Sequence, residues 1–386
     1  MITSSDSQLE LKFEVIIHDG LLDFTSIQRV NIELSENMHD LATLDIAGIP
    51  PEYLTTYIDL PVAIKLTVAR THSCIFKGYI TYLEPESINK NGLVNKSPFQ
   101  TTRMYCIGTS YVMRNRRTDV WNNVTLSQIV RTLADRYNLT ASVPNDPYVF
   151  PRLVQSGESD WSLLRKACEY LGYRVSMRTT HIDIWDPFTT LSRYGTAPLY
   201  AMAGNRGILN AEPGQVISFN ASVGAVTPES AKVPDTIHAL VDNEVVTISK
   251  DISTGYGNPV QSIFEDEVPA NAMSIPMANA VLQGRSRFKF PYTAHLTVVG
   301  NPSIQPGMLI QLGTYNSSVD GLWIVKSARH EAFRGSSMTY LTVEKDSEFS
   351  SIIDPLEKVF PSIPIPESVI KDFRWISTRE LVNVYS

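Results

Sequence analysis

The chain has 386 residues, a length typical of two or three domains, and 43% of them are hydrophobic, which is enough to build real cores. Its net charge of −7 argues against a general nucleic-acid binder. Charged residues make up only 19% of the chain, as expected for a protein that buries much of its surface against other subunits.

Targeting and redox features are sparse. The three cysteines are widely spaced and fit neither a disulfide framework nor a zinc site, which is typical of a protein folded in a reducing cytoplasm. No apolar run approaches the ~20 residues of a membrane span. The N-terminus lacks the basic start and apolar core of a signal peptide. We therefore expect no stable membrane insertion and no export by a standard N-terminal signal.

Residues 1–110 are predicted to form a first small β-barrel domain without a helix. Apolar residues recur at every second position in successive segments, and this period gives each strand one face for a core. Gly78 indicates a bulge or a close backbone contact. The predicted strands are Leu9–Ile17, Ile27–Leu34, Ala42–Ile46, Val62–Val68, Cys74–Leu83 and Arg103–Ile107.

Residues 111–205 are predicted to form an α+β insertion domain. Thr125 and Gln128 have the spacing of a capping box, and the apolar residues that follow recur with a helical period. A second helix is predicted from Ser159, with Gly172 as its left-handed C-terminal residue. Between the two helices, residues 139–157 are interpreted as a long connector.

Residues 206–345 are predicted to form a second barrel domain, with an irregular loop and a helix inserted at 241–290. The helix begins near Pro276 and has its own apolar face. Pro306-Gly307 is a turn sequence, because proline presets φ and glycine accepts positive φ. The chain then predicts an antiparallel meander that closes on itself, with strands at Ala294–Val299, Met308–Leu312, Leu322–Ala328 and Met338–Val343.

Residues 346–386 are predicted to be an extended C-terminal docking segment. Four prolines and wide gaps between apolar residues leave too little burial for a compact domain. Large side chains at intervals suit docking into grooves of another surface. The candidate anchors are Leu356, Phe360, Ile363, Phe373 and Trp375.

No catalytic, metal-binding or cofactor-binding pattern is found. None of the seven histidines has a second ligand at helical spacing, and there is no nucleophile elbow, phosphate loop or dinucleotide fingerprint. Glu158 and Asp160 flank a helix start, where carboxylates favour the helix dipole. Arg114, Arg116 and Arg117 are interpreted as a solvated or intersubunit charge patch. We predict no enzyme activity and no cofactor.

Two stretches resemble the phage tail baseplate hub family, which includes late-control protein D and the N-terminal part of type VI secretion VgrG spikes. One is the run ESDWSLLRKACEYLGYRV at 158–175, and the other contains GNPSIQPGM followed by DGLWIV and a histidine. The resemblance covers roughly residues 10–345. The positions that carry it are Asp160, Trp161, Leu164, Gly172, Tyr173, Gly300, Pro306, Gly307, Gly321, Trp323 and His330.

The resemblance implies a mainly β fold with an α+β insertion and two tandem tail-tube-like barrels. It also implies a homotrimer that forms a pseudo-sixfold ring and acts as a symmetry adaptor. Such a ring joins the tail tube protein to the central spike protein, contacts other baseplate proteins and passes DNA as cargo. It would be assembled in the host cytoplasm and located in the virion.

Three alternatives stay open from the sequence. The insertion could carry a tail-associated peptidoglycan hydrolase. The helix TLSQIVRTLADRYNL has some likeness to the start of a LysM cell-wall-binding module, although the long connector that follows departs from that motif. The chain could also be the hub of a phage-derived contractile injection device or a type VI secretion device.

Overall fold

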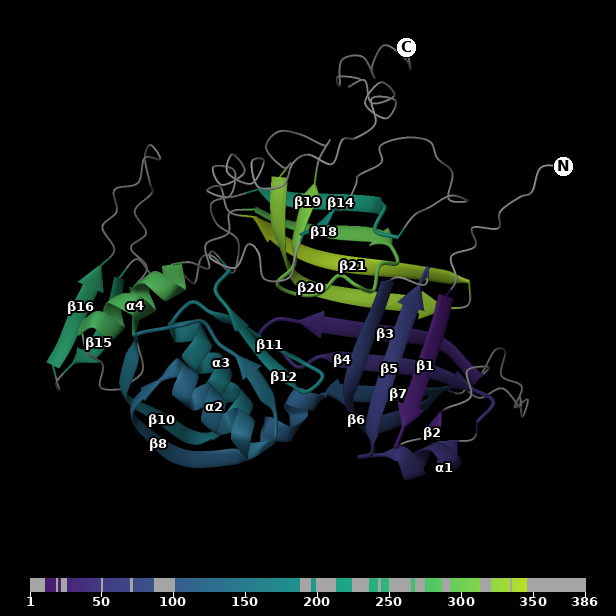
Figure 1. The fold of residues 1–386 in the computed structure, drawn as a ribbon, viewed down its shortest axis with the longest axis horizontal. Helices are drawn as coiled ribbons and strands as arrows, with labels where there is room; N and C mark the ends of the chain where they lie inside the picture. Colours follow the sequence, from purple (N-terminus) through teal and green to yellow (C-terminus); the bar gives the residue numbers. More distant parts are fainter. Residues whose placement is uncertain are drawn as a thin grey trace, which may run out of the picture. The chain divides into compact units, whose positions relative to one another are not determined.

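The computed structural model describes residues 11–18, 20–21, 26–49, 51–69, 72–86, 101–187, 196–198, 213–223, 236–241, 244–249, 265–267, 275–286, 292–312, 321–333 and 335–345 (Figure 1). Contacts group the chain into two units, Met1–Ser347 and Glu348–Ser386. The anchors predicted in the C-terminal segment lie outside the described residues, so that segment stays a prediction.

The described chain is mainly β with a helical insertion, which confirms the predicted fold class. Its largest sheet runs in the order β14-β18-β21-β20-β3-β4-β7-β6-β5-β1-β2, with β13 and β19 off this path. All six strands predicted in the N-terminal part are present. The N-terminal strands are β1 (Leu11–Ile17), β2 (Gly20–Leu21), β3 (Ile27–Ser35), β4 (Leu41–Ala47), β5 (Pro61–Val68), β6 (His72–Glu86) and β7 (Thr101–Gly108).

The prediction of no helix before residue 110 is wrong. A single turn, α1 (Pro51–Leu54), is followed by the 3-10 turn η2 (Thr55–Tyr57). The Thr55 hydroxyl donates to the Glu52 carbonyl at 2.7 Å, and Leu54 is buried in the first core. One turn is too short to show a helical period in the sequence, which is why alternation alone misses it.

The insertion contains two helices against short sheets. Helices α2 (Leu126–Arg136) and α3 (Asp160–Tyr170) begin as predicted, with the Thr125–Gln128 capping box formed and Ser159 accepting from the Ser162 amide. Gly172 has a φ of +73°, the left-handed conformation predicted for it. The remaining elements are the 3-10 helix η3 (Thr109–Arg114) and strands β8 (Arg116–Thr125), β9 (Thr140–Ser142), β10 (Val149–Ser159), β11 (Arg174–Arg178) and β12 (His181–Trp185).

The connector predicted at 139–157 is instead mostly strand. β10 pairs antiparallel with β8, placing Leu153 opposite Trp121, and its inward residues Phe150 and Leu153 are buried. Phe150 and Leu153 are three positions apart with Pro151 between them, so the sequence lacks the two-residue alternation that indicates the other strands.

Strands β19, β20 and β21 pair antiparallel in the predicted succession, but β18 and β19 are not paired, and β13 pairs parallel with β19. β18 pairs with β14 and β21, whereas β19 pairs with β20. The Gly300 amide donates to the Ser337 carbonyl at 2.9 Å and so continues the β18–β21 ladder by one residue. The strands are β13 (Thr196–Pro198), β14 (Val216–Val223), β18 (Tyr292–Val299), β19 (Leu309–Leu312), β20 (Gly321–Phe333) and β21 (Ser336–Lys345).

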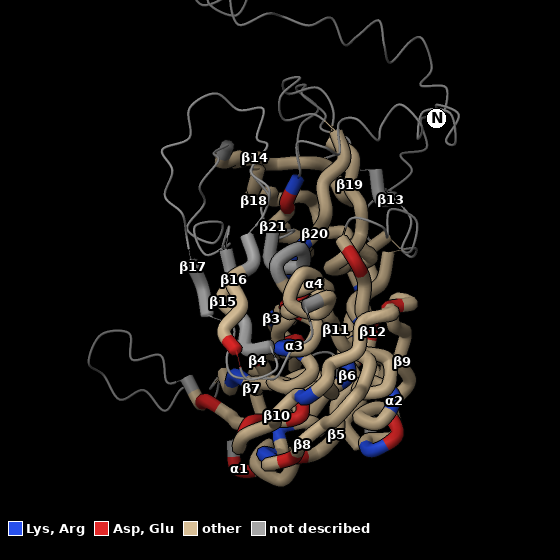
Figure 2. The backbone as a smooth tube through the Cα atoms, turned by 90° about the vertical axis from the view of Figure 1, so that its left-hand side faces the viewer, with Lys and Arg blue, Asp and Glu red and all other residues tan. Residues whose placement is uncertain are grey.

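The segment predicted to be irregular between 241 and 275 also contains strands, namely β16 (Glu244–Ser249) and β17 (Glu265–Glu267), which flank the preceding β15 (Thr236–Val241). The three strands form a small sheet beside helix α4 (Ile275–Ser286), as the two views in Figures 1 and 2 show. Met277 and Val281 of α4 are buried in the same hydrophobic cluster as α2 and α3. This helix therefore packs with the insertion and not with the C-terminal strands.

Strand β20 joins the two β-rich halves into one sheet. Its C-terminal part pairs antiparallel with β3, from Ser327 opposite Ser35 to Phe333 opposite Arg29. The described residues nevertheless form three separate hydrophobic clusters, one for the N-terminal strands, one for the insertion and one for the C-terminal strands. Barrel closure and the domain boundaries near 110, 205 and 345 stay predictions. No described helix has the length and hydropathy to cross a membrane.

Gly78 offers a direct test of the N-terminal sheet. A Cβ at this position would lie 2.0 Å from the Ile107 carbonyl oxygen, and backbone in a paired strand cannot move away from it easily. We expect Gly78→Ala to lower the free energy of unfolding by about 3 kcal/mol. Urea denaturation measures this, with Lys77→Ala on the same strand as the control. Equal stability of the two variants would contradict the close approach of β6 and β7.

Candidate functional site

The turn between β3 and β4 contacts both other parts of the described chain. The Glu36 amide donates to the Lys326 carbonyl at 3.2 Å, on β20. Asn37, whose φ is +58°, donates its amide to the Val175 carbonyl at 2.7 Å and accepts from the Val175 amide on Oδ1 at 3.0 Å. Residues 36–40 therefore attach the N-terminal strands to the C-terminal strands and to the insertion at one place.

Buried ion pairs surround the start of this turn. The Arg174 guanidinium from β11 pairs with Glu36 and, at 3.1 Å, with Glu344 of β21. The Lys326 ammonium from β20 donates to the second oxygen of Glu344 at 2.8 Å. Burial opposes ionisation of Glu344, but Arg174 and Lys326 outweigh it and hold its pKa below the usual range. We call Glu36, Arg174, Lys326 and Glu344 the junction.

The junction restricts how its three contributing parts can move. Arg174, Glu36 and Glu344 are almost fully buried, and a charge left there without its partner would carry a large desolvation cost. Moving any two of the three parts away from each other would leave at least one of these charges without its partner. The ion pairs therefore favour one relative arrangement, even though buried pairs contribute little net stability.

The other end of the turn packs on the insertion. The His39 ring stacks on Trp161 with ring centroids 5.4 Å apart, and its Nδ1 lies 2.7 Å from the Ser110 hydroxyl. Burial, together with nearby Arg165, lowers the pKa of His39. The ring is therefore neutral at neutral pH and contributes packing and not charge. Trp161 lies in the insertion core with Leu164, Cys168 and Leu171.

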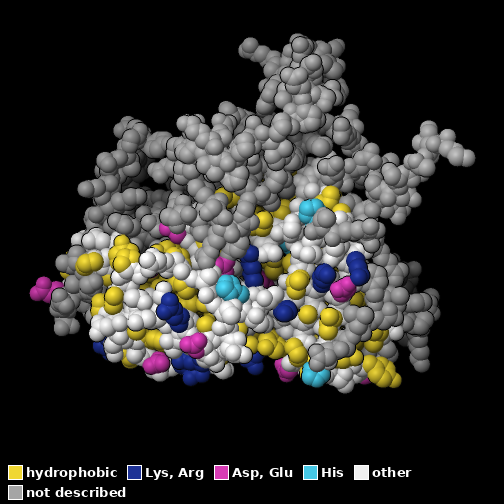
Figure 3. All heavy atoms as spheres, viewed as in Figure 1, with side chains coloured by type: hydrophobic (Ala, Val, Ile, Leu, Met, Phe, Trp, Pro, Cys, Tyr) yellow, Lys and Arg dark blue, Asp and Glu magenta, His cyan; other side chains and the backbone are white. Residues whose placement is uncertain are grey.

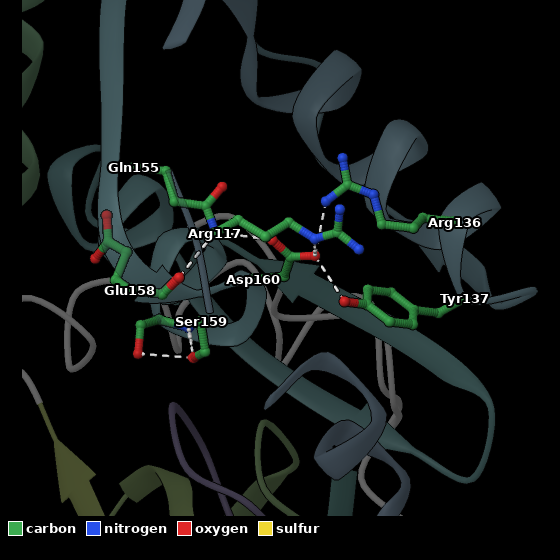
Figure 4. A network of polar contacts seen from close by, with 8 residues as sticks. Arg117, Arg136, Tyr137, Gln155, Glu158, Ser159 and Asp160 are labelled. Atoms are coloured by element: carbon green, nitrogen blue, oxygen red, sulfur yellow. Dashed lines mark hydrogen bonds and ion pairs between the residues drawn. The ribbon is translucent and has the colours of Figure 1, made fainter. Parts of the chain in front are cut away.

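A second polar cluster surrounds Asp160, the first residue of α3 (Figure 4). Its fully buried carboxylate accepts from Tyr137 Oη at 2.7 Å, Arg136 Nη1 at 2.7 Å and Gln155 Nε2 at 2.8 Å. Arg117 Nε lies 3.4 Å from the same carboxylate. Burial raises the pKa of Asp160, but the hydrogen bonds from Gln155, Tyr137 and Arg136 outweigh it, so the pKa is lowered overall.

The hydrogen bonds and ion pairs of Asp160 hold neighbouring elements together. Asp160 connects α2, β8 and β10 to the start of α3, and its oxygens already have donors. In Figure 4 the Glu158 carboxyl group points away from Asp160, and it pairs with Lys166 at 3.0 Å. A glycosidase would need two carboxyl groups facing each other across a cleft. Arg117 was predicted to belong to a solvated or intersubunit patch, but its guanidinium pairs with the buried Asp160 carboxylate.

His330 fixes the loop that precedes β19. Its Nε2 lies 3.0 Å from the Ile304 carbonyl, which only accepts, so Nε2 carries the proton and Nδ1 accepts from the Thr339 hydroxyl at 3.1 Å. Thr339 in turn accepts from the Asn301 amide at 3.0 Å. Burial lowers the pKa of His330 to about 4, opposed by the Ile304 carbonyl. The neutral imidazole thus holds both ends of the 301–304 segment.

The other family-like positions in this half have turn and core roles. Gly307 has a φ of +82° and Gly321 a φ of +125°, conformations that favour glycine. A Cβ on Gly300 would lie 2.1 Å from the Ser337 hydroxyl oxygen. Trp323 is fully buried with its ring edge-on to Phe219 at 6.2 Å, and Pro306 is buried in the turn.

The predicted positions fall into two groups in separate cores, not into one site. Asp160, Trp161, Leu164, Gly172 and Tyr173 belong to the insertion, and the other six to the C-terminal strands. The junction could not be predicted from the sequence, because a charge beside a buried apolar residue, as at Arg174 and Glu344, is also the ordinary pattern of a strand with one solvent-facing side. Among the residues that the structure describes, no group of three or more His, Cys, Asp or Glu could hold a metal ion.

Two solved tail proteins are similar to this chain in fold. A tail protein from Neisseria meningitidis MC58 matches with a TM-score of 0.59 at 11% identity, over 88% of this chain and 98% of that one. The prophage MuSo2 43 kDa tail protein from Shewanella oneidensis matches with a TM-score of 0.59 at 12% identity, over 86% of this chain and 98% of that one.

A third match is a component of the Escherichia coli type VI secretion system, described as structurally similar to the T4 bacteriophage tail proteins gp27 and gp5. Its TM-score is 0.55 at 11% identity, over 88% of this chain and 78% of that one. No protein-family model and no curated protein matches the sequence. The predicted resemblance to baseplate hub proteins is therefore confirmed at the level of the fold.

Asp160→Asn tests the buried carboxylate. The amide cannot balance the two arginines, so we expect a loss of about 3 kcal/mol in the free energy of unfolding at neutral pH. Because the folded-state pKa of Asp160 is lowered, its contribution is present above the unfolded pKa and lost as pH falls through the folded one. The difference from wild type should therefore shrink on acidification, as measured by urea denaturation between pH 7 and pH 3.

Glu158→Gln is the matched control, since Glu158 is an acid of the same segment whose ion pair with Lys166 is partly exposed. It should change stability by less than about 1 kcal/mol. If Asp160→Asn behaved like this control, or if its effect did not depend on pH, the Asp160 cluster would not have the role assigned to it.

Proposed function

We propose that the protein is a structural component of a phage tail tip, the central hub of the baseplate. The observation that carries this proposal is the fold match to tail proteins over 86–88% of the chain and 98% of theirs. More finely, the hub is a homotrimer whose ring joins the tail tube protein to the central spike protein and contacts other baseplate proteins.

The two β-rich halves support the trimeric ring. Each chain contributes one sheet with an N-terminal and a C-terminal half joined by β3 and β20. Three chains thus bring six such halves, which suits a part that must match a sixfold tube on one side and a threefold spike on the other. The junction supports the same role, because a ring of this kind needs halves that keep their relative arrangement.

DNA passes through the proposed ring without being held. The net charge of −7 per chain repels phosphates when summed over three copies. On the face drawn in Figure 3, the described Lys and Arg residues are interspersed with Asp and Glu. An interspersed surface gives DNA no continuous cationic track to bind.

The proposal places the protein in the virion after assembly in the host cytoplasm and gives it no enzyme activity. The buried and fully engaged Asp160 supports the absence of a hydrolase centre in the insertion. A second candidate function is the hub of a contractile injection or type VI secretion device, which the similarity to the Escherichia coli type VI component favours.

The trimer is tested by light scattering on the purified protein. We expect a species of three times the chain mass at micromolar concentration, or its appearance on adding tube or spike subunits, and a ring with a central hole in negative-stain images. A stable monomer under all these conditions would contradict the proposed hub.

The C-terminal segment is proposed to dock on a neighbouring subunit or on the spike through Leu356, Phe360, Ile363, Phe373 and Trp375. Deleting 351–386 should leave the melting transition of the β-rich chain in place and weaken trimer or spike association. Replacing Phe360, Phe373 and Trp375 with serine in the full-length chain should have the same effect. A truncated chain that assembles with unchanged affinity would show that the segment has no docking role.

A further inference from the structure

Strand β14 forms one end of the largest sheet. Among the strands that the structure describes, it pairs only with β18 (Figure 1). Its sequence VISFNASV has no charged residue and no proline, which are common means of protecting an edge strand from other chains. The other long edge strands of the described sheets carry charges, and on β8 the Asp119 carboxylate accepts from the Val120 amide at 2.9 Å. The free edge of β14 is therefore an unprotected template for a further strand.

Two backbone amides of β14 face this free edge. At the start of the β14–β18 ladder, the Gly214 amide donates to the Val299 carbonyl at 2.9 Å and the Val299 amide donates to the Gln215 carbonyl at 2.8 Å. Because hydrogen bonds alternate along an antiparallel strand, every second residue of β18 counted back from Val299 bonds to β14. The residues opposite these on β14 are Ser218, Asn220 and Ser222. The residues between them, Phe219 and Ala221, therefore direct their N–H and C=O groups to the free edge, and we call their amides the edge amides.

The inner face of β14 is also incompletely covered. Phe219 and Ala221 are only partly buried, although they pack against the hydrophobic cluster of the C-terminal strands. The Phe219 ring lies edge-on to the buried Trp323, with ring centroids 6.2 Å apart. Ile217, at the bulge near the start of the strand, is 54% exposed. An added strand would therefore gain apolar contacts as well as backbone hydrogen bonds, the combination on which strand addition depends.

Residues 367–386 have the composition of such a strand. They contain no proline, and valine, isoleucine and aromatic residues, which favour strands, are frequent among them. Phe373 and Trp375 are two positions apart, so in a strand both would lie on one face and could cover Phe219. The acidic and basic residues of the segment are equal in number, so a neutral segment would meet the uncharged β14 without repulsion.

The preceding residues favour a neighbouring copy as the source of the segment. Lys345, the last residue of β21, lies opposite Tyr292 of β18, which lies opposite Val223 of β14. The free edge of the same chain is thus only two strand spacings away, about 10 Å. Residues 346–366 contain four prolines, and a proline-rich spacer of this length extends to about 65 Å at ~3.1 Å per residue. Such a semi-rigid spacer suits a partner beyond its own chain.

We propose that residues 367–386 of a second copy of this chain add a strand to the free edge of β14. The proposal rests on the hub assembly proposed above and names the surface that receives the C-terminal segment. The incoming backbone bonds to Phe219 and Ala221, while Phe373 and Trp375 cover the open side of the C-terminal core. Each copy thus donates one strand and receives one, so a closed ring leaves no β14 edge free.

Residue-resolved hydrogen–deuterium exchange on the full-length protein at micromolar concentration tests this. In wild type the edge amides should exchange as slowly as the β14 amides that β18 protects. In the double variant Phe373→Ser/Trp375→Ser the edge amides should exchange about tenfold faster or more, while the amides facing β18 stay slow. Phe349→Ser is the matched control, because it removes an aromatic ring of the C-terminal segment outside 367–386, and its edge amides should stay slow.

A mixed assembly identifies which copy supplies the strand. When isotope-labelled double variant is co-assembled with excess unlabelled wild type, the edge amides of the labelled chains should recover slow exchange. The proposal is overturned if they do not recover, if the edge amides are fast in wild type, or if they are slow in the double variant alone. Light scattering on the same samples separates this failure from that of the hub: a wild-type trimer with fast edge amides contradicts only the strand addition, whereas a wild-type monomer contradicts the hub.

Discussion

Most of this structure depends on the cost of leaving a buried charge without its partner. Arg174, Glu36 and Glu344 come from three parts of the chain and are buried where those parts meet, and the partly exposed Lys326 pairs with Glu344. Burial of apolar surface holds each hydrophobic cluster together, but it has no preferred direction. The ion pairs require specific partners at specific positions, so they select one arrangement of the clusters. Together with the β3–β20 ladder they make a single scaffold from three cores.

The same principle acts locally in the two segments that resemble hub proteins. Asp160 is satisfied by donors from α2 and β10, and it sets where α3 begins relative to them. His330 has one assigned tautomer because both ring nitrogens have fixed partners, and it sets where the 301–304 segment lies. Buried polar groups of this kind rigidify a structure when every partner is present. The hub proposed above would work by geometry, so rigid placement of its halves is the property that the proposed function requires.

Elements with a clear period could be predicted from the sequence, whereas pairings between distant segments could not. The alternation in β1, β3 and β5 and the capping box at Thr125 are local patterns, and the structure contains each of them. β20 extends five residues past its predicted end, because a bulge near Lys326 and the buried polar run His330-Glu331 break the alternation. That extension pairs with β3, so the connection between the halves was hidden from periodicity. The junction was missed for a similar reason: Arg174 and Glu344 look like surface charges until their partners are known.

We infer that the junction makes the insertion and the two β-rich halves unfold as one cooperative unit. Thermal unfolding of the full-length chain, followed by tryptophan fluorescence and far-UV circular dichroism in wild type and in Arg174→Met, decides this. Methionine fills similar space but leaves Glu36 and Glu344 without their shared cation. We expect coincident transitions by both probes in wild type and separate transitions in Arg174→Met. Coincident transitions in the variant, or separate ones already in wild type, would contradict it.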